Sequence, residues 1–152
     1  MEKRAMIEKL SSLMKLDYDA AQAYETALKY IKDDDIHERI SEYHDDHLRH
    51  VKSLEEAIRG LGGTPPPETT TIRGLFLEGA AVMQGITGTE GSLRALLTGE
   101  RVTNKAYNDV LDLQFTPEIR STIDLFYRDE QKHIRYITSA IDVRVWEHKK
   151  AA

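Results

Sequence analysis

An internal repeat constrains the fold of this chain more than any other feature of its sequence. A shift of 83 residues, which places Tyr24 on Tyr107, aligns residues 10–58 with residues 93–141 without a gap. The identical residues that fall together are Leu10 and Leu93, Ala23 and Ala106, Tyr24 and Tyr107, Leu28 and Leu111, Ile36 and Ile119, Ile40 and Ile123, Asp46 and Asp129, His50 and His133, Ala57 and Ala140, and Ile58 and Ile141. Helical hairpins with similar apolar periods can align by chance, but the matched Tyr, Asp and His residues favour two equivalent halves related by a pseudo-twofold axis.

The spacing of apolar residues predicts four helices, two in each half. The first pair spans about residues 2–59, and the polar turn at residues 33–35 separates its two helices and can cap the second one. The second pair spans about residues 89–147, and its first helix is expected to end near Gln114. Thr116, Pro117 and Glu118 then form a helix start, with a cap residue, a proline in the first turn and an acid near the positive end. No segment alternates with period two, so the prediction is an all-α fold.

Residues 60–88 connect the two pairs and are too many for a tight turn between antiparallel helices. Gly60 and Pro65 lie in a run of glycines and prolines that ends the second helix. A helix of about 24 residues is roughly 36 Å long, and this connection can travel back along it. The sequence therefore predicts one domain, residues 1–152, folded as a four-helix bundle whose long crossover sets the third helix parallel to the second. A short helix over residues 72–86 is a further expectation.

Composition excludes several classes of protein. The formal net charge of −5 argues against a nucleic-acid partner, which would require a basic stripe. The absence of cysteine excludes disulfides, thiolate zinc sites, iron–sulfur clusters and a rubredoxin-type centre. The most apolar stretch, residues 74–89, contains Glu78 and is too short to span a bilayer. Because no secretory leader is visible at the N-terminus, we expect a cytoplasmic protein without a membrane association.

Each apolar stripe is interrupted near its middle by side chains that can bind a metal ion. These residues are Asp17 in the first predicted helix, His47 and His50 in the second, Glu100 in the third, and Glu130 and His133 in the fourth. The repeat superposes Asp17 on Glu100, and ligands three residues apart lie on one helix face and can converge on one site. Burying an uncompensated charge costs several kcal/mol, whereas a domain has only about 5–15 kcal/mol of net stability. A pair of metal ions would compensate these charges; a buried hydrogen-bond network or a partly solvated stripe is the alternative.

Two further kinds of polar residue also repeat. Tyr24 and Tyr107 lie two helical turns after Asp17 and Glu100 on the same faces. Asp46 and Asp129 precede the two repeated histidines by four residues, and each acid can orient a ligand histidine across the bundle. Core tyrosines with hydrated hydroxyls and solvent-facing acids are the structural alternatives. Three other histidines, His37, His44 and His148, have no ligand-like counterpart, and we expect them at the surface; Trp146 is expected to fill the core or an interface.

The four ligand segments resemble those of the ferritin-like superfamily, in which two helices each supply one Glu and the other two each supply Glu-x-x-His. The resemblance covers residues 8–59 and 90–146, and it is closest to a rubrerythrin-related, bacterial-type protein without a rubredoxin domain. It implies a ferritin-like bundle with a dinuclear site, most simply of iron, that takes dioxygen or peroxide in oxidative stress. It also implies that Tyr24 and Tyr107 hydrogen-bond to ligand carboxylates, and that Glu130 is the best candidate for a ligand that bridges the two ions.

The chain departs from the pattern of that superfamily at His47, where a carboxylate is usual. Three carboxylates, those of Asp17, Glu100 and Glu130, leave one positive charge beside two divalent ions. An added anion would balance this charge; alternatively, only one ion binds tightly. Three nitrogens and three oxygens suit iron, zinc, nickel or copper better than calcium or magnesium. We expect iron, with zinc or manganese as alternatives. Because Asp17 is one methylene shorter than Glu100, the two halves of the site should be unequal.

These observations leave two functional hypotheses. The first is a dinuclear iron protein that oxidises Fe(II) or reduces peroxide, with a separate electron donor because the chain has no cysteine. The second is a stress-related or scaffolding bundle, without enzymatic activity, in which zinc or another metal is structural. In both cases we expect a homodimer. An iron-storage shell is a third possibility for which the sequence offers no sign.

Overall fold

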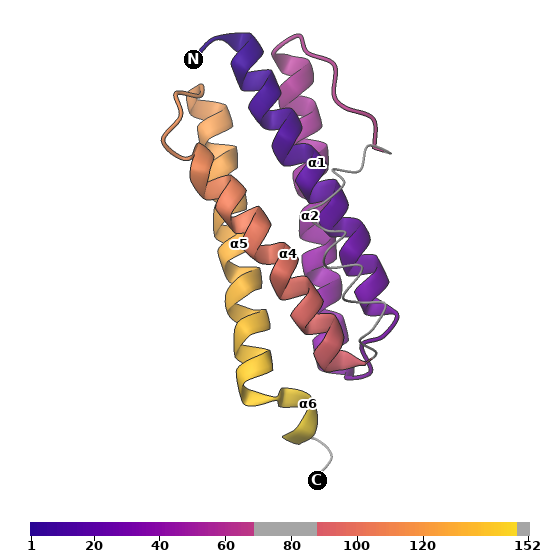
Figure 1. Ribbon diagram of the computed structural model, residues 1–152. Coiled ribbons are helices and arrows are strands. Elements are labelled where there is room, and N and C mark those ends of the chain that lie inside the picture. Colours follow the sequence, from indigo (N-terminus) through magenta and orange to yellow (C-terminus); the bar gives the residue numbers. More distant parts are fainter. Residues whose placement is uncertain (69–87, 149–152) are drawn as a thin grey trace.

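The computed structural model describes residues 1–68 and 88–148, and this part of the chain contains helices and no strand. The helices are α1 (Lys3–Leu28), α2 (Asp34–Gly60), α4 (Thr89–Val110), α5 (Pro117–Val143) and the short α6 (Val145–His148). Figure 1 shows that the four long helices lie alongside one another as a bundle. The predicted all-α four-helix bundle is therefore confirmed.

The helices are connected as the long crossover predicted. Helices α1 and α2 form one hairpin and α4 and α5 the other, and α1 packs against α4. Helix α4 runs in the same direction as α2 (Figure 1). Helices α2 and α5 approach each other least closely among the four neighbouring pairs. The short helix expected over residues 72–86 lies outside the described residues.

The repeat is visible in the helix boundaries. Helices α2 and α5 each have 27 residues, and the shift of 83 residues superposes both their first and their last residues. Their caps are equivalent too, since the side chain of Asp33 accepts a hydrogen bond from the N–H of Ile36, and that of Thr116 from the N–H of Ile119. Each cap satisfies a backbone donor that the first turn of a helix leaves free.

Two of the predicted helix ends were wrong. Helix α4 ends at Val110 instead of near Gln114, because the N–H groups of Leu111 and Leu113 bond to carbonyls three residues back and tighten the chain. Helix α5 ends at Val143 and does not continue to residue 147, since Arg144 adopts a left-handed conformation with φ 46°. The turn redirects the chain into α6, where Trp146 packs against the apolar core as expected.

Among the described residues, two large apolar clusters, one towards each end of the bundle, make up most of the core, and Leu16 and Ala20 form a small third one. One large cluster contains Met6, Leu10, Leu13, Met14, Val51, Leu54, Ile58, Tyr107, Val110, Ile119, Ile123 and Phe126. The other large cluster contains Tyr24, Ala27, Ile31, Ile36, Ile40, Tyr43, Leu93, Leu96, Ile137, Ala140 and Ile141. Each long helix contributes to both large clusters, and the residues between its two contributions face a polar layer at the middle of the bundle. Among the described residues, none of the helices has the length and apolar character needed to cross a bilayer.

We expect Asp33→Ala to lower the free energy of unfolding by about 1 kcal/mol, because it removes the side chain that caps α2. Urea denaturation followed by circular dichroism measures the change. Glu38→Ala is the control, since Glu38 is an exposed residue of the same helix. Equal effects of the two substitutions would show that the cap does not contribute.

Candidate metal centre

The six predicted ligands come together in the polar layer between the two apolar clusters. Their side chains belong to four helices and have 0–1% of their surface exposed. The layer occurs at the middle of every long helix, so the repeat places equivalent donors on opposite sides of one site. The structure therefore brings together every residue that the sequence singled out as a candidate ligand.

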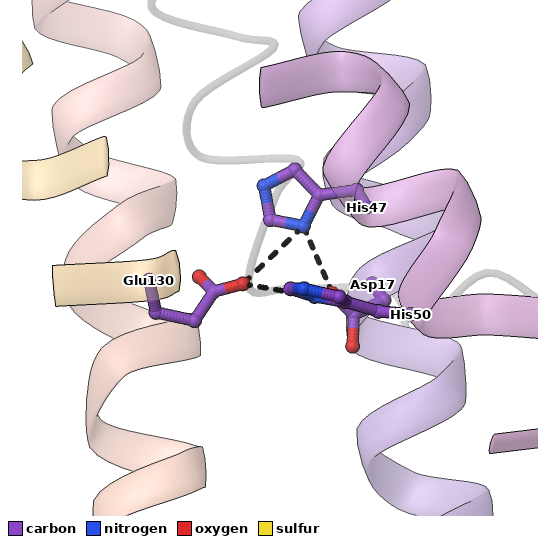
Figure 2. Close-up of side chains that lie close together, drawn as sticks. All are labelled: Asp17, His47, His50 and Glu130. Carbon is purple, nitrogen blue, oxygen red and sulfur yellow. Dashed lines mark hydrogen bonds and ion pairs between the residues drawn. The ribbon is translucent and has the colours of Figure 1, made fainter. Parts of the chain in front are cut away.

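The donors form two overlapping groups of four. In each group, one ligand atom from every member lies within 4.8 Å of the others. One group contains Asp17 and His50, the other contains Glu100 and His133, and both include His47 and Glu130. Figure 2 shows the first group, with Glu130 reaching across the bundle towards the two histidines of α2. Two adjacent positions for a cation, with two shared donors, follow from this arrangement.

The half of the site around Asp17 is held by both histidines of α2. Asp17 Oδ1 lies 2.9 Å from Nδ1 of His47 and 3.0 Å from Nδ1 of His50. The other carboxylate oxygen of Asp17 accepts a hydrogen bond from the hydroxyl of Tyr107. Glu130 Oε1 is 3.4 Å from Nδ1 of His50.

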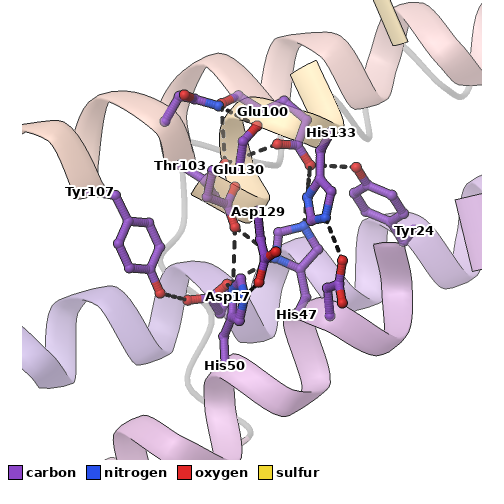
Figure 3. A network of polar contacts seen from close by, with 12 residues as sticks. Asp17, Tyr24, His47, His50, Glu100, Thr103, Tyr107, Asp129, Glu130 and His133 are labelled. Carbon is purple, nitrogen blue, oxygen red and sulfur yellow. Dashed lines mark hydrogen bonds and ion pairs between the residues drawn. The ribbon is translucent and has the colours of Figure 1, made fainter. Parts of the chain in front are cut away.

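The half of the site around Glu100 has contacts of the same kind. Glu100 Oε1 lies 3.2 Å from Nε2 of His47 and 3.5 Å from Nδ1 of His133. The hydroxyl of Tyr24 donates to the same oxygen. Each tyrosine thus bonds to the carboxylate of the opposite half, as Figure 3 shows, which confirms the expected pairing of tyrosines with ligand carboxylates.

Two acids hold the outer nitrogens of the repeated histidines. Asp129 Oδ2 lies 3.1 Å from Nε2 of His50, and Asp46 Oδ2 lies 2.9 Å from Nε2 of His133. Both contacts cross between α2 and α5, as predicted. A proton on Nε2 would be shared with the acid, which leaves Nδ1 of each ring as a lone-pair donor towards the centre.

Arg49 and Lys132 connect these acids to each other, a feature that the sequence analysis missed. Arg49 Nη2 lies 2.8 Å from oxygens of both Asp46 and Asp129, and Lys132 Nζ lies 3.1 Å from Asp46 and 3.6 Å from Asp129. The repeat superposes Arg49 on Lys132, so a search for paired cations would have found them. We refer to Asp46, Arg49, Asp129 and Lys132 as the α2–α5 clasp.

Thr103 is another residue that the sequence analysis missed. Its hydroxyl is buried and lies 3.1 Å from the backbone carbonyl oxygen of Glu100 and 3.5 Å from Glu100 Oε2. The repeat places Thr103 on Ala20, so no paired signal marks it. Among the other histidines, His37 is exposed and His44 is half-buried beside Asp45, in keeping with surface positions; the side chain of His148 lies outside the described residues.

Three buried atoms of the polar layer could bind a metal ion without giving up a hydrogen bond to a described residue. Both carboxylate oxygens of Glu130 and Nδ1 of His133 have no hydrogen-bond partner among the described residues. A buried polar atom is normally satisfied, because leaving it unpaired costs the full desolvation penalty. Carboxylate oxygens and imidazole nitrogens are ordinary ligands of iron and zinc, so the donor set fits a pair of such ions.

Burial and mutual attraction shift the pKa values of these groups in opposite directions. Burial alone would raise the pKa of Asp17, but His50 and His47 outweigh it and lower that pKa to about 2. Burial alone would lower the pKa of His50, but Asp17 and Asp129 outweigh it and raise that pKa to about 10. Burial and the charge of Glu100 raise the pKa of Glu130, although His47 opposes this rise. The layer thus holds charged groups that depend on one another.

Comparison with solved structures shows which class of protein this fold defines. A structure described as "Crystal structure of ferritin like, diiron-carboxylate proteins from Bacillus anthracis str. Ames" superposes with a TM-score of 0.73 at 21% sequence identity. The match covers 93% of this chain and 99% of that chain. The protein therefore has the ferritin-like four-helix-bundle fold.

The sequence also matches a protein-family model described as "Domain of unknown function (DUF2383)" over residues 5–113. The chain belongs to this family. No curated protein matches it.

We expect Asp17 and His50 to stabilise the chelator-treated protein most between pH 3.8 and pH 6.5. Folding raises the pKa of His50 from 6.5 to about 10, so its contribution is complete below pH 6.5 and is lost as the pH rises towards 10. Folding lowers the pKa of Asp17 from 3.8 to about 2, so its contribution is complete above pH 3.8 and is lost as the pH falls towards 2. Urea midpoints measured across this range test the profile.

His50→Gln is the control for the loss of stability above pH 6.5. Because this variant lacks the imidazole of His50, its free energy of unfolding should fall less than that of the wild type as the pH rises above 6.5. A wild-type urea midpoint that increases above pH 6.5 would contradict the assignment.

Proposed function

We propose that the protein binds two metal ions, and specifically iron, in the polar layer, and that it uses them to oxidise Fe(II) with dioxygen or peroxide. The observation that carries the proposal is the pair of overlapping four-donor groups, which share the carboxylate of Glu130, whose oxygens accept no hydrogen bond from the described residues. The resemblance of the fold to a diiron-carboxylate protein is consistent with it.

The choice of iron rests on the chemistry of the donor set. Asp17, Glu100 and Glu130 supply carboxylates, and His47, His50 and His133 supply imidazoles. Mixed oxygen and imidazole ligands suit iron and zinc, whereas calcium and magnesium prefer oxygen alone. Manganese is less favoured by a set that is half imidazole.

Iron bound at these residues would supply one-electron oxidation and reduction of an oxygen substrate. The chain itself supplies the ligands and fixes their orientation. Tyr24 and Tyr107 hold one oxygen of Glu100 and Asp17, respectively, so that the carboxylates keep their direction towards the centre. Asp46 and Asp129 hold the outer nitrogens of His133 and His50. The layer lies between the two apolar clusters, and its six candidate ligands have 0–1% of their surface exposed.

Fe(II) itself would supply the electrons that reduce dioxygen or peroxide, and the return of the bound iron from Fe(III) to Fe(II) would require electrons from another molecule. The chain has no cysteine with which to build an iron–sulfur or rubredoxin-type centre of its own. A separate electron donor is therefore part of this proposal.

A structural metal site is the second candidate, and the burial of the donors favours it. All six side chains have 0–1% of their surface exposed, and structural sites are closed, whereas catalytic sites keep an open position for substrate. In this candidate function the ions, for example zinc, hold the four helices together and no oxygen chemistry follows.

Addition of Fe(II) and then dioxygen or peroxide should yield about two iron atoms per chain by elemental analysis and a new near-ultraviolet absorption band. Glu130→Ala and His133→Ala should lose the band and at least one iron, because they remove a shared ligand and a terminal ligand. His37→Ala, which changes an exposed histidine, is the control and should behave as the wild type. A chain that never acquires metal from Fe, Mn or Zn solutions would contradict both candidate functions.

Removal of metal separates the two candidates further. If the ions stabilise the fold, their binding raises the free energy of unfolding. A metal concentration of 100 times the dissociation constant raises it by about 2.7 kcal/mol, and a chelator that removes the metal reverses this gain. We expect a lower melting temperature after chelation in either case, measured by circular dichroism. Peroxide consumption that returns with Fe(II) supports the oxidoreductase, whereas restored stability without any consumption supports the structural site.

A further inference from the structure

We propose that His47 binds both metal ions, one through each ring nitrogen, and so replaces the carboxylate that usually bridges such a pair. This inference rests on the proposed function, since it assumes that two ions enter the polar layer. It assigns His47 a different role from that of His50 and His133, although all three histidines are fully buried.

The two ring nitrogens of His47 face different halves of the site. Nδ1 lies 2.9 Å from Asp17 Oδ1 and 3.5 Å from Glu130 Oε1, within the first group of donors. Nε2 lies 3.2 Å from Glu100 Oε1, within the second group. Figure 3 shows the ring between Asp17 on one side and Glu100 on the other. One nitrogen is therefore available to each group.

The other two histidines cannot act in this way. Nε2 of His50 is bound by Asp129 and Nε2 of His133 by Asp46, so each ring has only Nδ1 for a metal ion. His47 has no acid of the α2–α5 clasp on either nitrogen. The repeat explains the difference, because it superposes His47 on Glu130, the other donor shared by both groups.

The charge of the site agrees with a shared His47. Three carboxylates leave one positive charge uncompensated beside two divalent ions. Both ring nitrogens of His47 lie against carboxylates, so coordination through both would displace two ring protons to solvent and leave an imidazolate with one negative charge. The imidazolate, with Asp17, Glu100 and Glu130, then balances two divalent ions without an added anion. This accounts for a histidine at a position where the superfamily uses a carboxylate.

To test the inference, we would measure how many of the two metal dissociation constants each substitution changes. The probe is Co(II), added to chelator-treated protein and followed by visible absorption in competition with a chelator of known affinity. We expect two dissociation constants for the wild type. His47→Ala should raise both by more than about 100-fold, since loss of an outer partner alone costs about 10–100-fold. His50→Ala and His133→Ala, the matched controls, should each raise mainly one.

Added imidazole provides a second readout, with circular dichroism to confirm that the variant is folded. Imidazole should restore both affinities of His47→Ala, whereas 1-methylimidazole, which has one free ring nitrogen, should restore at most one. If His47→Ala does not fold, His47→Gln replaces it, with the same expectation for the two constants.

The outcomes separate this inference from the proposed function. A wild-type chain that binds fewer than two Co(II) ions overturns the proposed dinuclear function and the inference with it. Two ions in the wild type, together with a His47 variant in which one dissociation constant is unchanged, overturn only the shared role of His47. Restoration of both affinities by 1-methylimidazole also overturns it.

Discussion

The desolvation of six ionisable side chains at the centre of the bundle is the constraint on which the rest of the structure depends. Moving a charge out of water costs several kcal/mol, and a chain with about 5–15 kcal/mol of net stability cannot bury several charges without compensation. Histidine and carboxylate therefore alternate around the layer, and two tyrosines donate to the carboxylates. Glu130 is the exception, since its oxygens receive no hydrogen bond from the described residues. Its position in both donor groups makes it the point where a cation would lower the energy most.

The pseudo-twofold repeat allows one short pattern to build both halves of this layer. Each half contributes its donors to the other: Tyr24 bonds to Glu100, Tyr107 to Asp17, and the clasp acids hold histidines across α2 and α5. Crosswise bonding means that neither hairpin contains a complete set of partners by itself. The layer therefore forms only when the two hairpins pack together, which links folding of the bundle to assembly of the site.

The α2–α5 clasp is partly exposed, since the side chains of Asp46 and Asp129 are 18% and 14% exposed. Helices α2 and α5 approach each other less closely than the other neighbouring pairs, and the clasp residues cross the gap. Arg49 and Lys132 are about half exposed, so their ion pairs with the acids add little stability by themselves. Their effect is on position, because they keep Asp46 and Asp129 directed at the outer nitrogens of His133 and His50.

The sequence by itself determined the four helices, the parallel crossover, a cap within residues 33–35 and the six candidate donors, because periodicity and an internal repeat are properties of the chain alone. It did not determine that α4 ends at Val110 or that Arg144 ends α5, since hydrogen bonds to carbonyls three residues back and one left-handed residue decide those ends. It also left open which acid meets which histidine and what His47 contacts. Only the tertiary structure decided these, because the partners lie on different helices, and the distances between them depend on how the two hairpins pack.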